Sequence, residues 1–139
     1  MDPADYNITD LIPQKPPMQM IDNLVSVTEH GAKGVLTIRR ENLFVENGFL
    51  SESALIEFIA QTAAAYTGYT SLVNHLPVKE GYIGAVKNLI IYELPAVDTQ
   101  IFSEIEIVNE IVGFTIIQGK VKSREKILAE CEMRILTAN

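Results

Sequence analysis

Glu57 is the residue of this sequence whose type and surroundings most suggest chemistry. It is the one formally charged side chain between Glu52 and Lys79, and it stands inside the apolar run from Ala54 to Tyr66. Burying a carboxylate among apolar neighbours is costly unless it is paired or its pKa rises. The side chain is therefore held neutral, faces water at the edge of a helix, or points into a polar cleft. In a cleft it is a candidate general acid or base.

The rest of the sequence offers few groups for catalysis. His30 lies in an expected turn and His75 follows the expected helix, and the neighbours of neither residue direct it to a site. There is no serine-nucleophile elbow, no phosphate-cradling glycine loop and no histidine pair spaced for a metal. Cys131 is the single cysteine, so an internal disulfide is excluded and a zinc cluster is unsupported. We therefore expect no metal and no redox cofactor.

The composition predicts one soluble globular domain over residues 1–139 that can bury a core. With 11 basic and 18 acidic residues the formal net charge is -7, which argues against nucleic acid or an anionic membrane as the main partner. The N-terminus lacks the basic start and apolar core of a signal peptide, so we expect a cytoplasmic location. Ala54 to Leu72 is interrupted by Glu57, Gln61 and several threonines, which favours a buried helix over a membrane span.

A long helix is expected from about Glu52 to about Val73, with Ser51 as its N-cap. Small and branched residues spread round most of its circumference, so other elements must cover it nearly all round. The other regular segments are expected to be strands, at residues 18–29, 33–40, 82–94, 99–109, 114–122 and 126–137. Short connections favour antiparallel neighbours. The fold class is therefore α+β, a mostly antiparallel sheet curved around one helix.

The last expected strand shows the clearest alternation of the chain. It sets Ala129, Cys131 and Met133 against the charged Glu130 and Glu132. Cys131 is therefore expected to be a buried, inert thiol.

Three segments, in family order, resemble the 3-hydroxyacyl-acyl carrier protein dehydratases. Leu11 to Asn23 is similar to the segment in which leucine and proline precede a histidine-arginine pair and an apolar strand ends in aspartate. Leu55-Ile-Glu-Phe-Ile-Ala-Gln61 looks like their central helix, whose glutamate is catalytic, and Tyr82 to Asn88 resembles their next strand. The likeness covers nearly the whole chain. It is greatest for a divergent branch of dehydratase-like proteins from polyene-pigment and polyketide-type clusters.

This resemblance implies the hot-dog fold, in which a curved antiparallel sheet wraps around one long helix, and at least a dimer. It implies that Glu57 would protonate the departing 3-hydroxyl while the Gly84 amide polarises the thioester carbonyl, as an oxyanion-type donor. Phe44, Phe49 and Gln61 are expected to line the pocket, from their positions around the loop and the helix. The substrate would arrive on the phosphopantetheine of an acyl carrier protein or of CoA. The protein partner would be a second copy or a related hot-dog subunit.

One departure from the family bears directly on catalysis. The family's catalytic histidine precedes the helix and removes the C2 proton, but at that spacing this chain has Leu43, and no histidine occurs between Glu41 and Phe49. Gln14 likewise stands where the N-terminal motif usually has histidine. Because dehydration needs a base for carbon and an acid for oxygen, Glu41 or Glu46 would have to substitute for the missing base.

The sequence leaves three functions open. The first is a 3-hydroxyacyl thioester dehydratase of fatty acid or polyene assembly. The second is a non-catalytic acyl-binding subunit that completes a heteromer, which the missing histidine favours. The third is a hot-dog thioesterase in which Glu57 activates water or attacks the carbonyl. The retained charge of Glu57 favours an enzyme, since a purely structural helix gains nothing from it.

Overall fold

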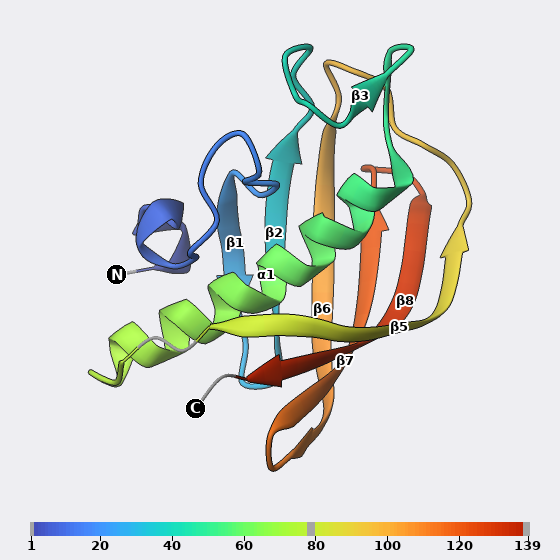
Figure 1. Cartoon of the computed structure of the whole chain (residues 1–139). Helices are drawn as coiled ribbons and strands as arrows, with labels where there is room; N and C mark the ends of the chain where they lie inside the picture. The colour runs from blue at the N-terminus through green and yellow to red at the C-terminus, as the bar shows by residue number, and fades with distance from the viewer. Residues whose placement is uncertain (1, 78–79, 138–139) are drawn as a thin grey trace.

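A six-stranded antiparallel sheet curves around one long helix (Figure 1) in the computed structural model, which describes residues 2–77 and 80–137. The elements in chain order are η1 Pro3–Asp5, η2 Ile8–Asp10, β1 Asn23–Val27, β2 Gly31–Thr37, β3 Val45–Glu46, β4 Phe49–Leu50, α1 Glu52–Val73, β5 Gly81–Ile91, β6 Gln100–Ile111, β7 Phe114–Lys122 and β8 Ile127–Thr137. β3 and β4 form a separate short hairpin. The arrangement confirms the predicted α+β class and the hot-dog fold.

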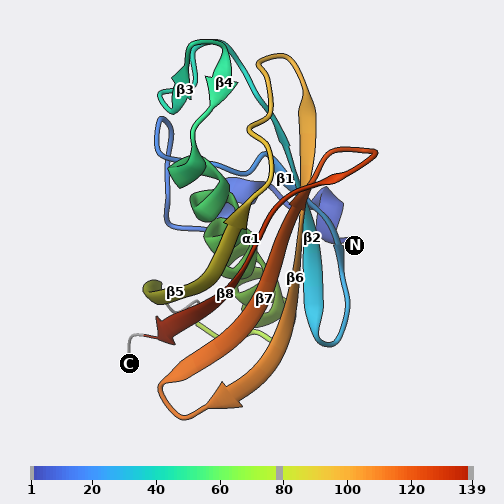
Figure 2. The ribbon, with the colours of Figure 1, turned by 90° about the vertical axis from the view of Figure 1, so that its right-hand side faces the viewer.

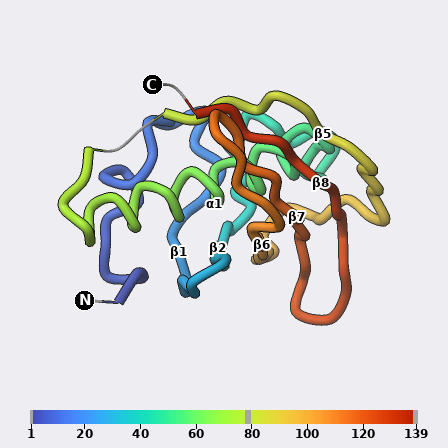
Figure 3. The backbone as a smooth tube through the Cα atoms, turned by 90° about the horizontal axis from the view of Figure 1, so that it is seen from below, coloured from blue at the N-terminus to red at the C-terminus, as the bar shows by residue number. Residues whose placement is uncertain are grey.

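The strand order in the large sheet is β1-β2-β6-β7-β8-β5, so the first strand and the strand after the helix lie at opposite edges. Every neighbouring pair is antiparallel. The sheet bends around α1, which lies against its concave side (Figure 2). The view from below shows α1 between the β1–β2 side and the β5–β8 side (Figure 3).

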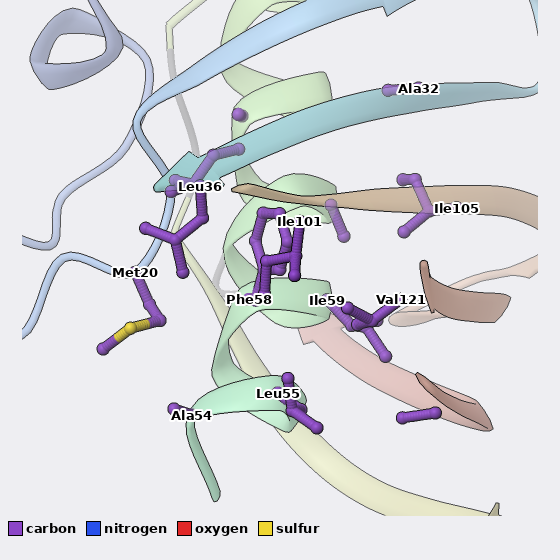
Figure 4. Close-up of a cluster of buried hydrophobic side chains, with 14 of the residues drawn as sticks. Met20, Ala32, Leu36, Ala54, Leu55, Phe58, Ile59, Ile101, Ile105 and Val121 are labelled. Atoms are coloured by element: carbon purple, nitrogen blue, oxygen red, sulfur yellow. The ribbon is translucent and has the colours of Figure 1, made fainter. Parts of the chain in front are cut away.

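The helix begins at Glu52 and ends at Val73, the bounds that the sequence predicts. Its N-terminal half packs into the core, where Leu55, Phe58 and Ile59 are fully buried (Figure 4). They lie against side chains from β6 and β7, such as Ile101 and Val121 (Figure 4). Burying a large apolar side chain stabilises the fold by roughly 1.5–3 kcal/mol, so these contacts hold the helix in the sheet.

A series of buried hydrogen bonds fixes the position of the helix relative to the sheet. The Thr62 hydroxyl lies 2.7 Å from the carbonyl oxygen of Phe58, its acceptor, and 2.5 Å from the hydroxyl of Ser103 on β6. The amide of Gly34 on β2 donates to the same Ser103 oxygen at 3.1 Å. These hydrogen bonds join α1, β2 and β6 at one point, and they satisfy hydroxyl groups that would otherwise be costly to bury.

Two predicted segments differ in the structure. β1 is shorter than predicted, because residues 18–21 pack against α1, where the side chain of Gln61 bonds the backbone of Met20, instead of pairing in the sheet. The stretch before the helix, for which the sequence predicted no strand, contains the β3–β4 hairpin. Its turn residues Asn47 and Gly48 have φ of 52° and 84°, as a two-residue Asn-Gly hairpin turn requires.

Cys131 on β8 is 2% exposed, and burial raises the pKa of its thiol to about 11. The prediction that Cys131 is buried is confirmed, and a raised pKa leaves little of the reactive thiolate at neutral pH.

Gly68 of α1 provides the first test of the packing. A methyl group at this position would overlap the backbone carbonyl of Leu11, which cannot move away as a side chain could. Alanine is a better helix former than glycine by about 1 kcal/mol, so an exposed Gly→Ala change would stabilise the helix. We expect Gly68→Ala instead to lower the free energy of unfolding by roughly 1–3 kcal/mol in urea titrations. Ser71→Ala is the control in the same helix, and equal effects of the two changes would contradict the close approach.

Glu104 on β6 provides a pH-dependent test. A hydrogen bond from Lys122, 3.0 Å away, holds the pKa of this carboxyl below its ordinary value of 4.5, and Lys33 at 3.4 Å lowers it further. Because the folded-state pKa is depressed, the stabilisation is present above the ordinary pKa and disappears as the pH falls through the folded-state value. Glu104→Gln should therefore lower the free energy of unfolding at neutral pH by roughly 0.2–1 kcal/mol per ion pair lost.

The difference between wild type and Glu104→Gln should vanish in acid, as measured by urea unfolding over a pH series. Glu106→Gln, two residues along the same strand, serves as the control. A difference that persisted unchanged in acid would exclude the ion pairs as its source.

Candidate functional site

A cavity of about 380 Å³ lies between α1 and the inner face of β5 to β8. Its helix wall is made of small side chains, those of Ala60, Ala63 and Ala64, and its sheet wall is made of isoleucines on β6, β7 and β8. The small helix residues leave a gap because they cannot fill the distance to the sheet. An apolar interior with polar groups round its rim is typical of a ligand-binding site.

Glu57 lies in the wall of this cavity and is only partly buried. Of the three possibilities that the sequence left open, the structure therefore places the side chain at a cleft. Gln61, one helical turn further on, has its amide nitrogen 3.4 Å from a carboxylate oxygen of Glu57. This contact and the helix backbone orient the carboxylate toward the cavity, where it can exchange a proton with a bound ligand.

Gln61 is fully buried and is not among the residues that line the cavity. Its oxygen accepts a hydrogen bond from the amide of Met20, and its nitrogen donates to the carbonyl of Met18 at 3.0 Å. Gln61 therefore fastens the segment before β1 to α1, beside Glu57. It also supports the Glu57 side chain and does not face the cavity.

Gly84 lies in a β-bulge of β5, where the register with β8 passes from Ile83 to Ala85. A bulge residue is left out of the regular ladder, so its backbone groups are available to another partner. Gly84 itself is exposed and lies next to Ile83, which does line the cavity. The sequence-predicted amide donor is thus one residue away from the cavity rim.

Phe44 and Phe49 lie away from Glu57. Phe44 is half-buried against the core, and Phe49 is 48% exposed. Phe49 lines a second, shallow hollow at the start of α1, together with Glu46 and Leu94. The structure therefore brings Glu57 and the neighbourhood of Gly84 together, but not the two phenylalanines.

The two carboxylates considered as replacements for the missing base are also apart from Glu57. Glu41 and Glu46 are both exposed, and neither lines the cavity. Within one chain the loop before the helix and the cavity of Glu57 are separate places.

Glu110 on β6 is a second cavity-lining carboxylate, which the sequence analysis did not single out. The alternation Glu104-Ile105-Glu106-Ile107 predicts that residue 110 faces outward with the glutamates. A β-bulge intervenes, because Ile107 pairs with Ile117 whereas Asn109 pairs with Ile116. One extra residue exchanges the two faces of a strand, so Glu110 turns inward opposite Thr115.

Tyr66 lies in the helix wall of the cavity and is affected by the charge of Glu110. Burial is the main cause that raises the pKa of Tyr66, and the negative charge of Glu110 raises it further. The phenol donates a hydrogen bond to the carbonyl of Glu29 at 2.9 Å. With Thr67 and Thr115, these residues make one end of the cavity polar.

In residues 2–77 and 80–137 no group of three or more His, Cys, Asp and Glu residues is placed to hold a metal ion. Over the same ranges no helix is both long and apolar enough to span a bilayer.

Comparison with known proteins agrees with this geometry. A family model described as ApeP-like, ApeP dehydratase, matches residues 6–139. No curated protein matches the chain.

Among solved structures, the dehydratase heterocomplex ApeI:P from Xenorhabdus doucetiae superposes with a TM-score of 0.90 at 14% identity, over 96% of this chain and 92% of that one. The uncharacterized protein PH1136 from Pyrococcus horikoshii gives a TM-score of 0.70 at 12% identity, over 100% and 94% of the two chains. A hypothetical thioesterase with coenzyme A from Streptococcus pneumoniae gives 0.67 at 8% identity, over 84% and 85%. At these identities the likeness establishes the shared fold.

Gln61→Leu tests the anchoring of the segment before β1. The substitution keeps the volume but leaves the Met20 amide and the Met18 carbonyl without their partner. Each unpaired buried group costs roughly 1–3 kcal/mol, so we expect a fall of about 2–4 kcal/mol in the free energy of unfolding. Gln118→Leu, at an exposed position of β7, is the matched control. Equal urea midpoints for the two variants would contradict the assigned role of Gln61.

Proposed function

The chain belongs to the ApeP-like dehydratase family, and we propose that it contributes Glu57 to a 3-hydroxyacyl thioester dehydratase whose C2 base comes from a second subunit. In that reaction a base takes the C2 proton, the C3–oxygen bond breaks, and an acid protonates the departing hydroxyl. The products are an enoyl thioester and water. Glu57 acts as the acid on the hydroxyl, in keeping with its place in the wall of an apolar cavity.

The observation that carries the proposal is that, among the described residues, no second acid–base group stands beside Glu57 in the cavity to take the C2 proton. The carboxylates of the preceding loop, Glu41 and Glu46, are exposed outside the cavity. Glu110 lines the cavity but is exposed, and its charge acts on Tyr66, nine positions along α1 from Glu57. At 1.5 Å per residue Tyr66 lies about 14 Å along the helix axis from Glu57, which places the charge of Glu110 in a different part of the cavity.

The edge strand β5 supports a second subunit at this site. β5 ends the sheet, and its side chains Tyr82, Ile83, Leu89 and Ile90 are 55%, 40%, 39% and 45% exposed. A long edge with exposed apolar side chains is prone to pair with another strand. Tyr82 and Ile83 also line the cavity of Glu57, so a subunit paired with β5 would border the same cavity.

The partner that best fits is a related hot-dog subunit that keeps the histidine. The solved structure with the TM-score of 0.90 is described as a dehydratase heterocomplex, which supports a heteromer for this chain as well. In such a heteromer the partner's histidine would remove the C2 proton, and Glu57 would protonate the hydroxyl. A second copy of this chain would bring another Leu43 to that place, and leucine cannot act as a base.

Gly84 is the proposed donor to the thioester carbonyl. Its position in a bulge of β5 leaves its amide outside the regular ladder, next to a residue of the cavity rim. A hydrogen bond to that carbonyl stabilises the enolate that forms when C2 loses its proton.

We propose that the substrate arrives on the phosphopantetheine of an acyl carrier protein or of CoA, in cytoplasmic fatty acid or polyene assembly. The isoleucines and alanines of the cavity provide an apolar surface for the part of the acyl thioester next to the reacting carbons. Phosphopantetheine would enter as part of the substrate, so the chain needs no cofactor of its own for this step.

Mass spectrometry of a 3-hydroxyacyl carrier protein tests the proposal. The purified chain alone should leave the substrate unchanged, because it has an acid but no base. Addition of a histidine-bearing hot-dog dehydratase subunit that binds it should cause loss of water. Glu57→Gln in this chain should slow the dehydration by roughly 10²–10⁴-fold, the usual contribution of a well-placed acid or base.

Leu43→His provides a one-chain version of the same experiment. It restores a histidine at the family's position, which a second copy of the variant would bring to the cavity. We expect dehydration by the paired variant without any other subunit, and loss of that activity in Leu43→His, Glu57→Gln. Water loss catalysed by the wild-type chain alone would place the base within this sequence and contradict the proposal. Release of a free acid would instead identify a thioesterase, and binding without turnover in every combination would identify a non-catalytic subunit.

A further inference from the structure

The carboxamide of Gln14 has a buried oxygen in the cavity wall that no described residue satisfies. Its oxygen is buried and has no hydrogen-bond partner among the residues that the structure describes, although Gln14 lines the cavity. A buried polar atom without a partner is uncommon in native proteins and calls for an explanation, such as a missing water or a ligand. Turning this carboxamide toward a ligand would break no hydrogen bond to its oxygen.

The segment that carries Gln14 is fastened to α1 at two points on the same side of Glu57. The Leu11 carbonyl lies against Gly68, and the backbone of Met18 and Met20 bonds Gln61. These two helix positions lie about 16 Å and 6 Å along the axis from Glu57, at 1.5 Å per residue. Gln14 lies between the two anchors in the chain, so its side chain enters the cavity from the segment held on the Gly68 side of Glu57.

We propose that Gln14 is a substrate-binding residue whose carboxamide oxygen accepts a hydrogen bond from an amide N–H of the phosphopantetheine arm. This inference rests on the proposed function, because it assumes a pantetheine thioester in the cavity of Glu57. A pantetheine arm carries secondary amides at a distance from the reacting carbons, and Gln14 supplies an acceptor on the segment held on the Gly68 side of the catalytic acid. The threonines at the polar end of the cavity, Thr67 and Thr115, offer hydroxyl groups to the amide carbonyls of the arm.

The chemistry of the side chain agrees with this assignment. A carboxamide is both donor and acceptor and is uncharged, so it matches a secondary amide without burying a charge. Gln14 also stands where the related dehydratases usually have histidine. The substitution exchanges a side chain that titrates near neutral pH for one that does not, which suits binding rather than proton transfer.

Gln19 offers a matched control in the same segment. Its amide oxygen is also buried without a partner in the described part of the chain, while its nitrogen donates to the Ile21 carbonyl at 2.8 Å. Gln19 does not line the cavity. The two glutamines therefore share an unpaired buried oxygen and differ in their access to a ligand.

Binding of decanoyl-pantetheine, measured by isothermal titration calorimetry, tests the inference. The second probe is the same thioester with both pantetheine amides N-methylated, which removes their N–H donors. The proteins are the wild-type chain, Gln14→Leu, Gln19→Leu and Gln14→Glu, which keeps an acceptor oxygen. Thermal unfolding of each variant establishes that it is folded.

We expect Gln14→Leu to weaken binding of decanoyl-pantetheine roughly three- to tenfold, the range for one neutral hydrogen bond, and Gln14→Glu to restore it. The N-methylated probe should bind wild type and Gln14→Leu equally, and Gln19→Leu should bind both probes as wild type does. Unchanged affinity in Gln14→Leu, or the same loss for both probes, would overturn the assignment and indicate a water at Gln14. Failure of the wild type to bind either probe, even with the histidine-bearing subunit present, would contradict the proposed function itself, and this inference with it.

Discussion

The α1 helix carries apolar and small side chains round most of its circumference, so it is stable only where other elements cover it on several sides. The curved sheet meets that demand, because its strands bend round the helix (Figure 2) and bury Phe58 and its neighbours (Figure 4). The hydrogen bonds that join Thr62, Ser103 and Gly34 set the position of the helix within this cover. The remaining features of the molecule, including its cavity, depend on where the helix is held.

The cavity arises from the same packing. Where α1 presents leucine, phenylalanine and isoleucine, the helix and the sheet are in contact, and where it presents Ala60, Ala63 and Ala64 a gap remains. Glu57 lies where the large side chains give way to small ones, and it therefore faces the gap. Gln61 ties the neighbouring segment to the helix beside it, so the acid is supported by the fold rather than by a mobile loop.

The proposed role of Glu57 as an acid, with no base beside it among the described residues, is consistent with an enzyme whose site is completed by another subunit. The feature that would attract such a subunit, the exposed apolar edge of β5, also supplies part of the cavity rim through Tyr82 and Ile83. Assembly and catalysis are then linked, because the pairing that covers the edge would also bring new groups to the cavity. Loss of the histidine in one subunit is tolerable when the other subunit retains it.

The sequence by itself determined the features that depend on local pattern. The bounds of α1 follow from Ser51 as N-cap and from the length of the apolar run after it. The bounds of β7 and the burial of Cys131 follow from strand-like runs that alternate with a period of 2 residues. The importance of Glu57 also follows locally, since its charge is isolated in an apolar run. The alternating strands and the single apolar helix were sufficient for the fold class.

Only the tertiary structure decided the features that depend on contacts between distant segments. The inward turn of Glu110 results from a register shift against β7, which no alternation within β6 reveals. Residues 18–21 leave the expected strand because Gln61, some forty positions away, bonds to their backbone. Gln14 reaches the cavity because both ends of its segment are held on α1. In each case the interaction that fixes the residue involves a partner far away in the sequence. The pattern of neighbouring residues therefore cannot predict it.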